Sequence, residues 1–286
     1  MKRVIGIGEL LWDVLPEGKQ LGGAPCNFVY HAQKQGAEGY VLSAVGDDKY
    51  GGEILEVLKS KSISPDLVQV NDKPTSTVDV ILNEQGIPEY TIHENVAWDF
   101  ICYNETIERK LSETDMVCFG TLAQRNVISR NAIEKILDTC HPDTLRVYDV
   151  NLRQHYFSQP IVENSLMLCN VLKVNEEELP VICGMVGIKS GDEEERAVHL
   201  MRRYDLKLVA LTKGINGSLL VTPKDRSFLP TPGVDVRDTV GAGDAFTAAM
   251  AVGYANNVSL KNLHQQAVEI SAYVCTREGA MPEYNL

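Results

Sequence analysis

Residues 238–244 read Asp238-Thr239-Val240-Gly241-Ala242-Gly243-Asp244, and small or apolar residues dominate from there to Tyr254. This composition predicts a buried helix that begins at the glycines. Backbone N–H groups at a helix N-terminus can approach an anion closely where side chains are small, and the helix dipole favours negative charge there. Asp244 would then act as a base on a hydroxyl that faces the anion. In a simpler interpretation, the glycines turn the chain and Asp244 caps the helix.

Short strands and helices alternate along the rest of the chain. Apolar runs that end in polar or glycine residues predict buried strands at Val4–Gly8, Val41–Val45, Asp115–Gly120, Leu145–Val150, Val171–Val174 and Lys207–Thr212. Apolar residues at helical spacing predict helices over 128–137, 197–204 and 263–274. This alternation predicts an α/β fold with a mostly parallel sheet covered on both faces. In such sheets ligands bind beyond the carboxyl ends of the strands.

One region departs from this rhythm. Ser76–Leu82 and Glu89–His93 read as a hairpin joined by Asn83–Pro88, and Leu11–Leu15 reads as a further short strand. Extra strands beside a parallel sheet predict a small β lid, contributed by about 11–21 and 76–97. We find no linker or repeat, so residues 1–286 are expected to form a single domain. Because unpaired edge strands invite a partner, we expect a homodimer through the lid.

Composition limits the partners and the compartment. The 286 residues include 27 Lys plus Arg and 39 Asp plus Glu, for a formal charge of −12. Such a field repels nucleic acid and anionic membranes, so neither is an expected partner. The seven cysteines are odd in number and lack Cys-x-x-Cys spacing, which favours reduced thiols in a cytoplasmic protein. The N-terminal apolar run is interrupted by Glu9 and Asp13, so neither a signal peptide nor a membrane span is expected.

The segment 238–244 resembles the C-terminal signature of the ribokinase-like (PfkB) carbohydrate kinases, Asp-Thr-x-Gly-Ala-Gly-Asp, and the likeness extends from Ile5 to about Pro282. The resemblance implies a ribokinase-like three-layer α/β/α core with a mostly parallel central sheet and a small β lid. It implies ATP and Mg²⁺ as cofactors and a small sugar as substrate. Asp244 would be the catalytic base, and Gly241, Ala242 and Gly243 would stabilise the transferring phosphoryl group.

The same family expects a sugar-binding turn near the N-terminus. Gly22-Gly23-Ala24-Pro25-Cys26-Asn27 matches its paired glycines and Asn. The resemblance implies that Gly22 and Gly23 let the sugar approach, that Asn27 bonds its hydroxyls, and that Asp13 accepts hydrogen bonds from them. Taken alone, the segment favours a simple turn at the glycines and a helix cap at Asn27.

A second acceptor segment follows the predicted strand Leu145–Val150. Asp149-Val150-Asn151-Leu152-Arg153 resembles the Asp-Pro-Asn-Leu-Arg of bacterial and plant fructokinases, with Val150 in place of proline. Residues 8–16 also resemble the opening of those enzymes. Asn151 and Arg153 are therefore expected at the sugar, and fructose is the expected acceptor.

Nucleotide and metal sites are implied by further matches. Asn175-Glu176-Glu177-Glu178 matches the family's Asn-x-x-Glu, which places Asn175 near the phosphates and Glu178 in the magnesium shell through water. Without the resemblance, this segment reads as an acidic helix start. A nucleotide-binding turn is implied at Thr212, Lys213, Gly214 and Gly217. A potassium ion is implied near Asp238, Val240, Arg277 and Gly279.

Other functions remain open at this stage. Segment 93–99 lacks the Arg-bearing pattern of typical fructokinases, so ribose, a 2-keto-3-deoxy sugar acid or a nucleoside are alternative acceptors. Arg153 supports the sugar acid as an alternative acceptor, because guanidinium pairs well with carboxylate. A sugar sensor without catalysis is an alternative of another class, but it would need no base at Asp244. A dinucleotide oxidoreductase is disfavoured, because Leu11 follows Gly6-Ile7-Gly8 where a third glycine belongs.

Overall fold

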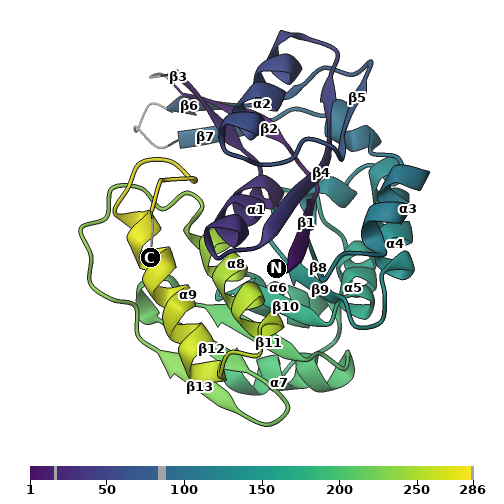
Figure 1. Cartoon of the computed structure of the whole chain (residues 1–286). Helices are drawn as coiled ribbons and strands as arrows, with labels where there is room; N and C mark the ends of the chain where they lie inside the picture. The colour runs from purple at the N-terminus through teal and green to yellow at the C-terminus, as the bar shows by residue number, and fades with distance from the viewer. Residues whose placement is uncertain (16–17, 83–87, 285–286) are drawn as a thin grey trace.

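A central sheet organises the computed structural model, which describes residues 1–15, 18–82 and 88–284 (Figure 1). From one edge to the other, its strands within these residues are β13 (Arg226–Leu229), β12 (Ser218–Val221), β11 (Leu208–Thr212), β10 (Val171–Asn175), β9 (Leu145–Asp149), β8 (Met116–Phe119), β1 (Arg3–Ile7), β4 (Glu38–Gly46) and β5 (Val68–Asn71). The strands from β11 to β5 are parallel, whereas β12 and β13 pair antiparallel at one edge. The predicted parallel sheet is confirmed.

Helices cover both faces of this sheet. On one face lie α1 (Ala24–Lys34), α2 (Lys49–Ser60), α8 (Ala242–Ala255) and α9 (Leu260–Cys275). On the other lie α3 (Glu105–Leu111), α4 (Val127–Thr139), α5 (Gln159–Leu168), α6 (Glu178–Met185), α7 (Glu193–Arg203) and the short 3₁₀ turns η1 (Ala97–Phe100) and η2 (Leu122–Gln124). A third turn, η3 (Gly214–Asn216), follows β11. Within the described residues, no helix has both the length and the apolar character needed to span a membrane.

The inner strands of this sheet read as continuous apolar runs because both of their faces are buried. In β8, Met116 and Cys118 join the cluster under α1 and α8, while Val117 and Phe119 join the cluster under α4 and α5. Successive side chains of a strand point to opposite faces, so one short strand contributes to both cores. This arrangement is the three-layer α/β/α architecture expected from the sequence.

A second, smaller sheet stands beside the first and appears at the top of Figure 1. Its strands, in order, are β3 (Gly18–Gly22), β2 (Leu11–Leu15), β6 (Ser76–Leu82) and β7 (Pro88–Ile92). The predicted hairpin and the strand at 11–15 are confirmed, although the hairpin loop at 83–87 lies outside the described residues.

The second lid segment was predicted to reach residue 97, which is too far. Strand pairing ends at Ile92, and Ala97–Phe100 forms η1 within the main core. Trp98 is fully buried there, so hydrophobic burial draws this segment away from the small sheet.

The order of the strands locates the ligand edge. From the central β1, the chain adds β4 and β5 on one side and then β8 to β11 on the other. Ligands of such sheets bind where this order reverses, beyond the carboxyl ends of the strands. The carboxyl ends of β1, β8, β9, β10 and β11 therefore share one edge with the start of α8.

Candidate active site

The turn before α8 requires glycine at its first position. Gly241 is the N-cap of α8 and has φ of 77°, a left-handed conformation. A Cβ at this position would lie 2.7 Å from Ala280, so the turn packs directly against the C-terminal segment. His31 fixes that segment, because its ring Nε2 lies 2.8 Å from the carbonyl oxygen of Ala280. Ala242 and Gly243 complete the first turn of α8, where backbone N–H groups lack partners within the helix.

Asp244 lies in the same turn and contacts the predicted sugar-binding helix. The Nδ2 of Asn27, on α1, donates a hydrogen bond of 2.8 Å to Asp244 Oδ2. Asn27 is 4% exposed, and its buried Oδ1 has no partner among the described residues. A buried acceptor without a donor destabilises the folded state. A hydroxyl of a bound molecule that donates a hydrogen bond to this oxygen would therefore bind favourably.

The pKa of Asp244 is raised to about 7, mainly because burial removes its carboxylate from water. The negative charge of Asp149 raises it further, while the hydrogen bond from Asn27 and the positive charge of Lys173 oppose the shift. A carboxyl group with a pKa near neutrality is suited to taking a proton from a hydroxyl.

A buried ion pair lies beneath the α8 turn. Lys173 on β10 donates to Asp149 on β9 at 3.0 Å, and both side chains are less than a tenth exposed. Thr247 Oγ1, one turn along α8, donates to the other carboxylate oxygen of Asp149 at 2.9 Å. A Cβ at Gly243 would lie 3.3 Å from Lys173 Nζ, so the ammonium sits directly below the backbone of that turn.

Lys173 remains a cation despite its burial. Burial acts to lower its pKa, but the negative charges of Asp149 and Glu178 outweigh that effect and the pKa is raised. Sequence analysis missed Lys173, Asp149 and Thr247 as site residues. The available signal was the single charged residue in the apolar strand Val171–Asn175, which pairs in register with Asp149.

The predicted acceptor residues converge on the other side of Asp244. Gly22 on β3 lies against Asp13 on β2, since a Cβ at Gly22 would be 2.3 Å from Asp13 Oδ2. Gly23 has φ of 113° and caps α1, and a Cβ there would meet the carbonyl oxygen of Glu9 at 2.3 Å. Burial raises the pKa of Asp13 to about 6. The structure therefore places Asp13, Gly22, Gly23 and Asn27 around the start of α1.

A small cleft lies between the start of α1 and the edge of the sheet. Its lining includes Glu9, Gly120, Asn151 and Asp244. Asn151 adopts φ of 44° directly after β9. Arg153 is exposed nearby, and its positive charge acts to lower the pKa of both Glu9 and Asp244. Both residues predicted in this segment thus lie at or near the cleft.

The predicted nucleotide residues gather along the next strands. Asn175 at the end of β10 pairs in register with Thr212 at the end of β11. Lys213 N–H donates to the carbonyl oxygen of Gly217 at 2.8 Å, which closes the turn that contains Gly214. The ammonium of Lys213 forms an ion pair of 2.7 Å with Glu193.

Asn175 and Glu178 also shape the start of α6. Asn175 Oδ1 accepts hydrogen bonds from the N–H groups of Glu177 and Glu178, at 3.0 and 2.8 Å. The Glu178 carboxylate accepts from Leu152 N–H and Asn175 N–H, each at 2.9 Å. The interpretation of this segment as a helix start is therefore confirmed alongside its place at the ligand edge.

The residues predicted at metal ions come from separate segments of the chain. Across the described ranges, no group of three or more His, Cys, Asp or Glu side chains is arranged to hold a metal ion. Asp238 accepts from Val240 N–H and Gly279 N–H, each at 3.0 Å. It thereby joins the two segments that carry the predicted potassium residues, Arg277 among them.

Comparisons with known proteins agree with this geometry. The model of the pfkB family carbohydrate kinases matches residues 15–285. The uncharacterized sugar kinase PH1459 of Pyrococcus horikoshii is 26% identical over 267 residues, covering 87% of this chain and 82% of that protein. Its crystal structure superposes with a TM-score of 0.83 over 98% of this chain and 94% of that one.

Fructokinases are also among the relatives. The fructokinase of Klebsiella pneumoniae is 26% identical over 293 residues, covering 96% of this chain and 94% of that protein. The structure of Xylella fastidiosa fructokinase with bound ATP, at 17% identity, shares the fold with a TM-score of 0.86 and covers 98% of this chain and 94% of its own. The family model matches nearly the whole length of this chain, so the chain belongs to the pfkB family of carbohydrate kinases.

Proposed function

We propose that this ATP-dependent sugar kinase transfers the γ-phosphoryl group to a primary hydroxyl of a monosaccharide, and that fructose is the acceptor. The observation that carries the proposal is the hydrogen bond between Asn27 and Asp244, which brings the sugar-binding turn to the N-terminus of α8. The fructokinase-like segment 149–153 and the Klebsiella pneumoniae relative support fructose.

In this proposal Asp244 takes the proton of the acceptor hydroxyl. Its pKa near 7 keeps a sizeable fraction ionised at neutral pH. General base catalysis of this kind contributes ~10²–10⁴-fold in rate. Asn27 holds one carboxylate oxygen, so the other is oriented for the hydroxyl. The backbone N–H groups of Gly241, Ala242 and Gly243 stabilise negative charge on the transferring group, and each such donor can supply ~3–4 kcal/mol.

The acceptor is held by groups that surround Asp244. Asp13 accepts hydrogen bonds from sugar hydroxyls, and the unpaired Oδ1 of Asn27 accepts one more. Gly22 and Gly23 let the turn pack against Asp13 and the carbonyl oxygen of Glu9, because a side chain at either position would collide with these groups. Asn151 and Arg153 bind the far side of the sugar from the loop after β9.

The nucleotide binds along the carboxyl ends of β10 and β11 in this proposal, against Asn175, Thr212, Lys213, Gly214 and Gly217. Lys173 adds a positive charge beneath the phosphates. Magnesium, when bound, neutralises the phosphate charge, and Glu178 would hold it through water. The segments around Asp238, Val240, Arg277 and Gly279 would hold potassium.

Three further features belong to the same proposal. The small sheet of β2, β3, β6 and β7 acts as a lid that excludes water from the acceptor. Its open edge strands pair with a second copy of the chain to form a homodimer. The cysteines of the described residues are unpaired, which suits a reducing, cytoplasmic location.

The test is ADP release from Mg-ATP with fructose, ribose, 2-keto-3-deoxygluconate, adenosine and inosine as separate acceptors. We expect release with fructose, and its loss in Asp244→Asn. Release with a different acceptor would overturn fructose but keep the kinase mechanism. Silence with every acceptor, together with absent ATP binding, would favour a sugar sensor instead.

A further inference from the structure

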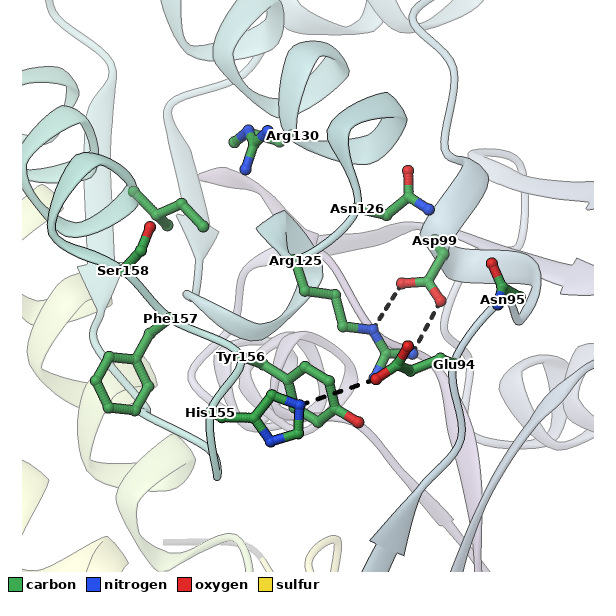
Figure 2. Close-up of a pocket in the computed structure, with 11 residues that line it drawn as sticks. Glu94, Asn95, Asp99, Arg125, Asn126, Arg130, His155, Tyr156, Phe157 and Ser158 are labelled. Atoms are coloured by element: carbon green, nitrogen blue, oxygen red, sulfur yellow. Dashed lines mark hydrogen bonds and ion pairs between the residues drawn. The ribbon is translucent and has the colours of Figure 1, made fainter.

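A second cavity, of about 400 Å³, lies beyond the carboxyl ends of β8 and β9 (Figure 2). It is walled by the segment before η1, by the start of α4, and by residues 155–158 after β9. None of the acceptor, catalytic, nucleotide or metal residues assigned above lines it. The loop after β9 connects the two places, because Asn151 lines the small cleft and Tyr156 lines this cavity.

Arg125 enters this cavity with one donor unused. Its side chain is 6% exposed, and its Nε and Nη2 donate to the two carboxylate oxygens of Asp99 at 2.8 and 2.9 Å. Its Nη1 is buried and has no hydrogen-bond partner among the described residues. The guanidinium lies 4.0 Å from the centre of the Trp98 ring and 4.7 Å from that of Tyr156. A buried cationic donor held this rigidly is prepared for an acceptor that the protein does not supply.

Further positive groups face the same space. Arg130 lines the cavity from α4, and its hydrogen bond to the carbonyl oxygen of Gln124 is long, at 3.4 Å. Asn126 and Ser158, the N-caps of α4 and α5, also line it, so two helix N-termini direct their partial positive charges there. Ser158 makes no capping bond to its own helix, which leaves its hydroxyl available.

Two carboxylates balance the two arginines of the cavity in formal charge, so the case for an anion rests on unused hydrogen-bond donors rather than on net charge. Both oxygens of Asp99 are engaged by Arg125. Glu94 is 57% exposed, and its carboxylate lies 3.9 Å from His155 Nε2, an ion pair when that ring is protonated. Glu94 therefore lies at the solvent-facing side, while the interior is rich in donors.

We propose that this cavity binds the phosphate or carboxylate group of a small organic anion, with Arg125 Nη1 and Arg130 as its donors. This binding site goes beyond phosphoryl transfer, and only one of its two sources of anion, an acidic acceptor in place of fructose, bears on which sugar is phosphorylated. The acidic group comes either from the acceptor itself, reaching across the loop after β9, or from a separate anionic metabolite.

Trp98 reports on the site through Arg125, whose guanidinium packs against its ring. The chain has two tryptophans, so Trp12→Phe leaves Trp98 as the sole indole. Titration of this variant with inorganic phosphate should change the Trp98 fluorescence saturably, and sodium chloride at equal ionic strength should not. Arg130→Gln should weaken phosphate binding at least tenfold. The matched control Arg109→Gln, which removes an exposed arginine of α3, should leave the affinity unchanged.

Absence of a saturable signal, or equal affinity in Arg130→Gln and the Trp12→Phe parent, would overturn the proposal. Arg125→Lys keeps the charge but removes Nη1, and should also weaken binding; if it fails to fold, Arg130→Gln alone decides. The assay needs no turnover, so it fails independently of the kinase proposal. Displacement of phosphate by 2-keto-3-deoxygluconate but not by fructose would assign the acidic group to the acceptor. Displacement by neither would assign it to a separate anion.

Discussion

Replacing Lys173 by methionine tests the buried charge network beneath the α8 turn. Methionine is unbranched and keeps much of the aliphatic volume, so the change removes chiefly the ammonium. Asp149 would then lie buried with only the hydrogen bond from Thr247. Glu178 and Asp244, whose carboxylates are also stabilised by this ammonium, would lose the same cation.

The expected loss follows from the burial of the pair. Breaking a buried ion pair by removing one partner costs ~3–5 kcal/mol, because an uncompensated charge remains. Thr247 still satisfies one oxygen of Asp149, so we expect the lower end, about 3 kcal/mol of unfolding free energy at neutral pH. The double variant Lys173→Met/Asp149→Asn removes both charges and should regain at least about 2 kcal/mol, since partners in contact are not additive.

Urea unfolding followed by circular dichroism measures both values, provided the transition is two-state. The deficit of Lys173→Met should shrink as the pH falls below about 7, because burial raises the pKa of Asp244 to about 7 and its protonated form gains nothing from the ammonium of Lys173. A loss below about 1 kcal/mol, or a double variant no more stable than the single one, would refute the reasoning. The exposed Lys224→Met serves as the control and should change stability by less than about 0.5 kcal/mol.

Three other perturbations address the site. Asp244→Asn should cut kcat at least ~10²-fold while calorimetric ATP binding changes little, and near-normal turnover would exclude the base role. At about pH 8 the same variant should unfold at a higher urea concentration than the parent protein. The pKa of Asp244 in the folded state, about 7, exceeds the ordinary 3.8, so ionisation of this carboxyl destabilises the native state as pH rises. The profile of kcat/KM against pH should fall on the acid side below about 7, and a profile flat down to about pH 5 would contradict the raised pKa. Gly241→Ala should lose ~1–3 kcal/mol of stability through its positive φ and the collision with Ala280, whereas Gly243→Ala, opposite the flexible end of Lys173, should lose less.

The inner strands of the parallel core could be predicted because they are apolar on both faces, whereas the edge strand β5 (Val68–Asn71) was missed because its residues are polar in part and only half-buried or exposed. Met116–Phe119 contributes to both clusters, and such runs are visible without any knowledge of their neighbours. The antiparallel strands β12 and β13 were not predicted. Ser218–Val221 is a four-residue run, and Arg226–Leu229 alternates between exposed and half-buried residues at an edge. Their pairing is fixed by contacts that a local pattern does not contain.

The residues of the candidate site were likewise only partly predictable from the sequence. Asp244 and Asn27 could be named from motifs, because glycine-rich turns mark both helix starts. Lys173 was missed, although it is the single charged residue of the apolar strand Val171–Asn175, because a lone lysine does not by itself distinguish an exposed end from a buried cation. The pairing of Arg125 with Asp99 joins segments 26 residues apart, and only the folded chain shows that Trp98 and Tyr156 enclose that arginine.

The hydrogen bond from Asn27 to Asp244 joins two stretches that are 217 residues apart in the chain. Four of the groups assigned to the sugar fall within residues 13–27 and two, Asn151 and Arg153, follow β9, whereas those assigned to phosphoryl transfer and the nucleotide fall within 173–244. Selection for a new acceptor can therefore act on segments before residue 154 while the later machinery is inherited intact. For protein engineering, the same separation makes residues 11–27 and 151–153 the natural units to graft together between relatives, with Asn27 retained as the fixed point of the exchange.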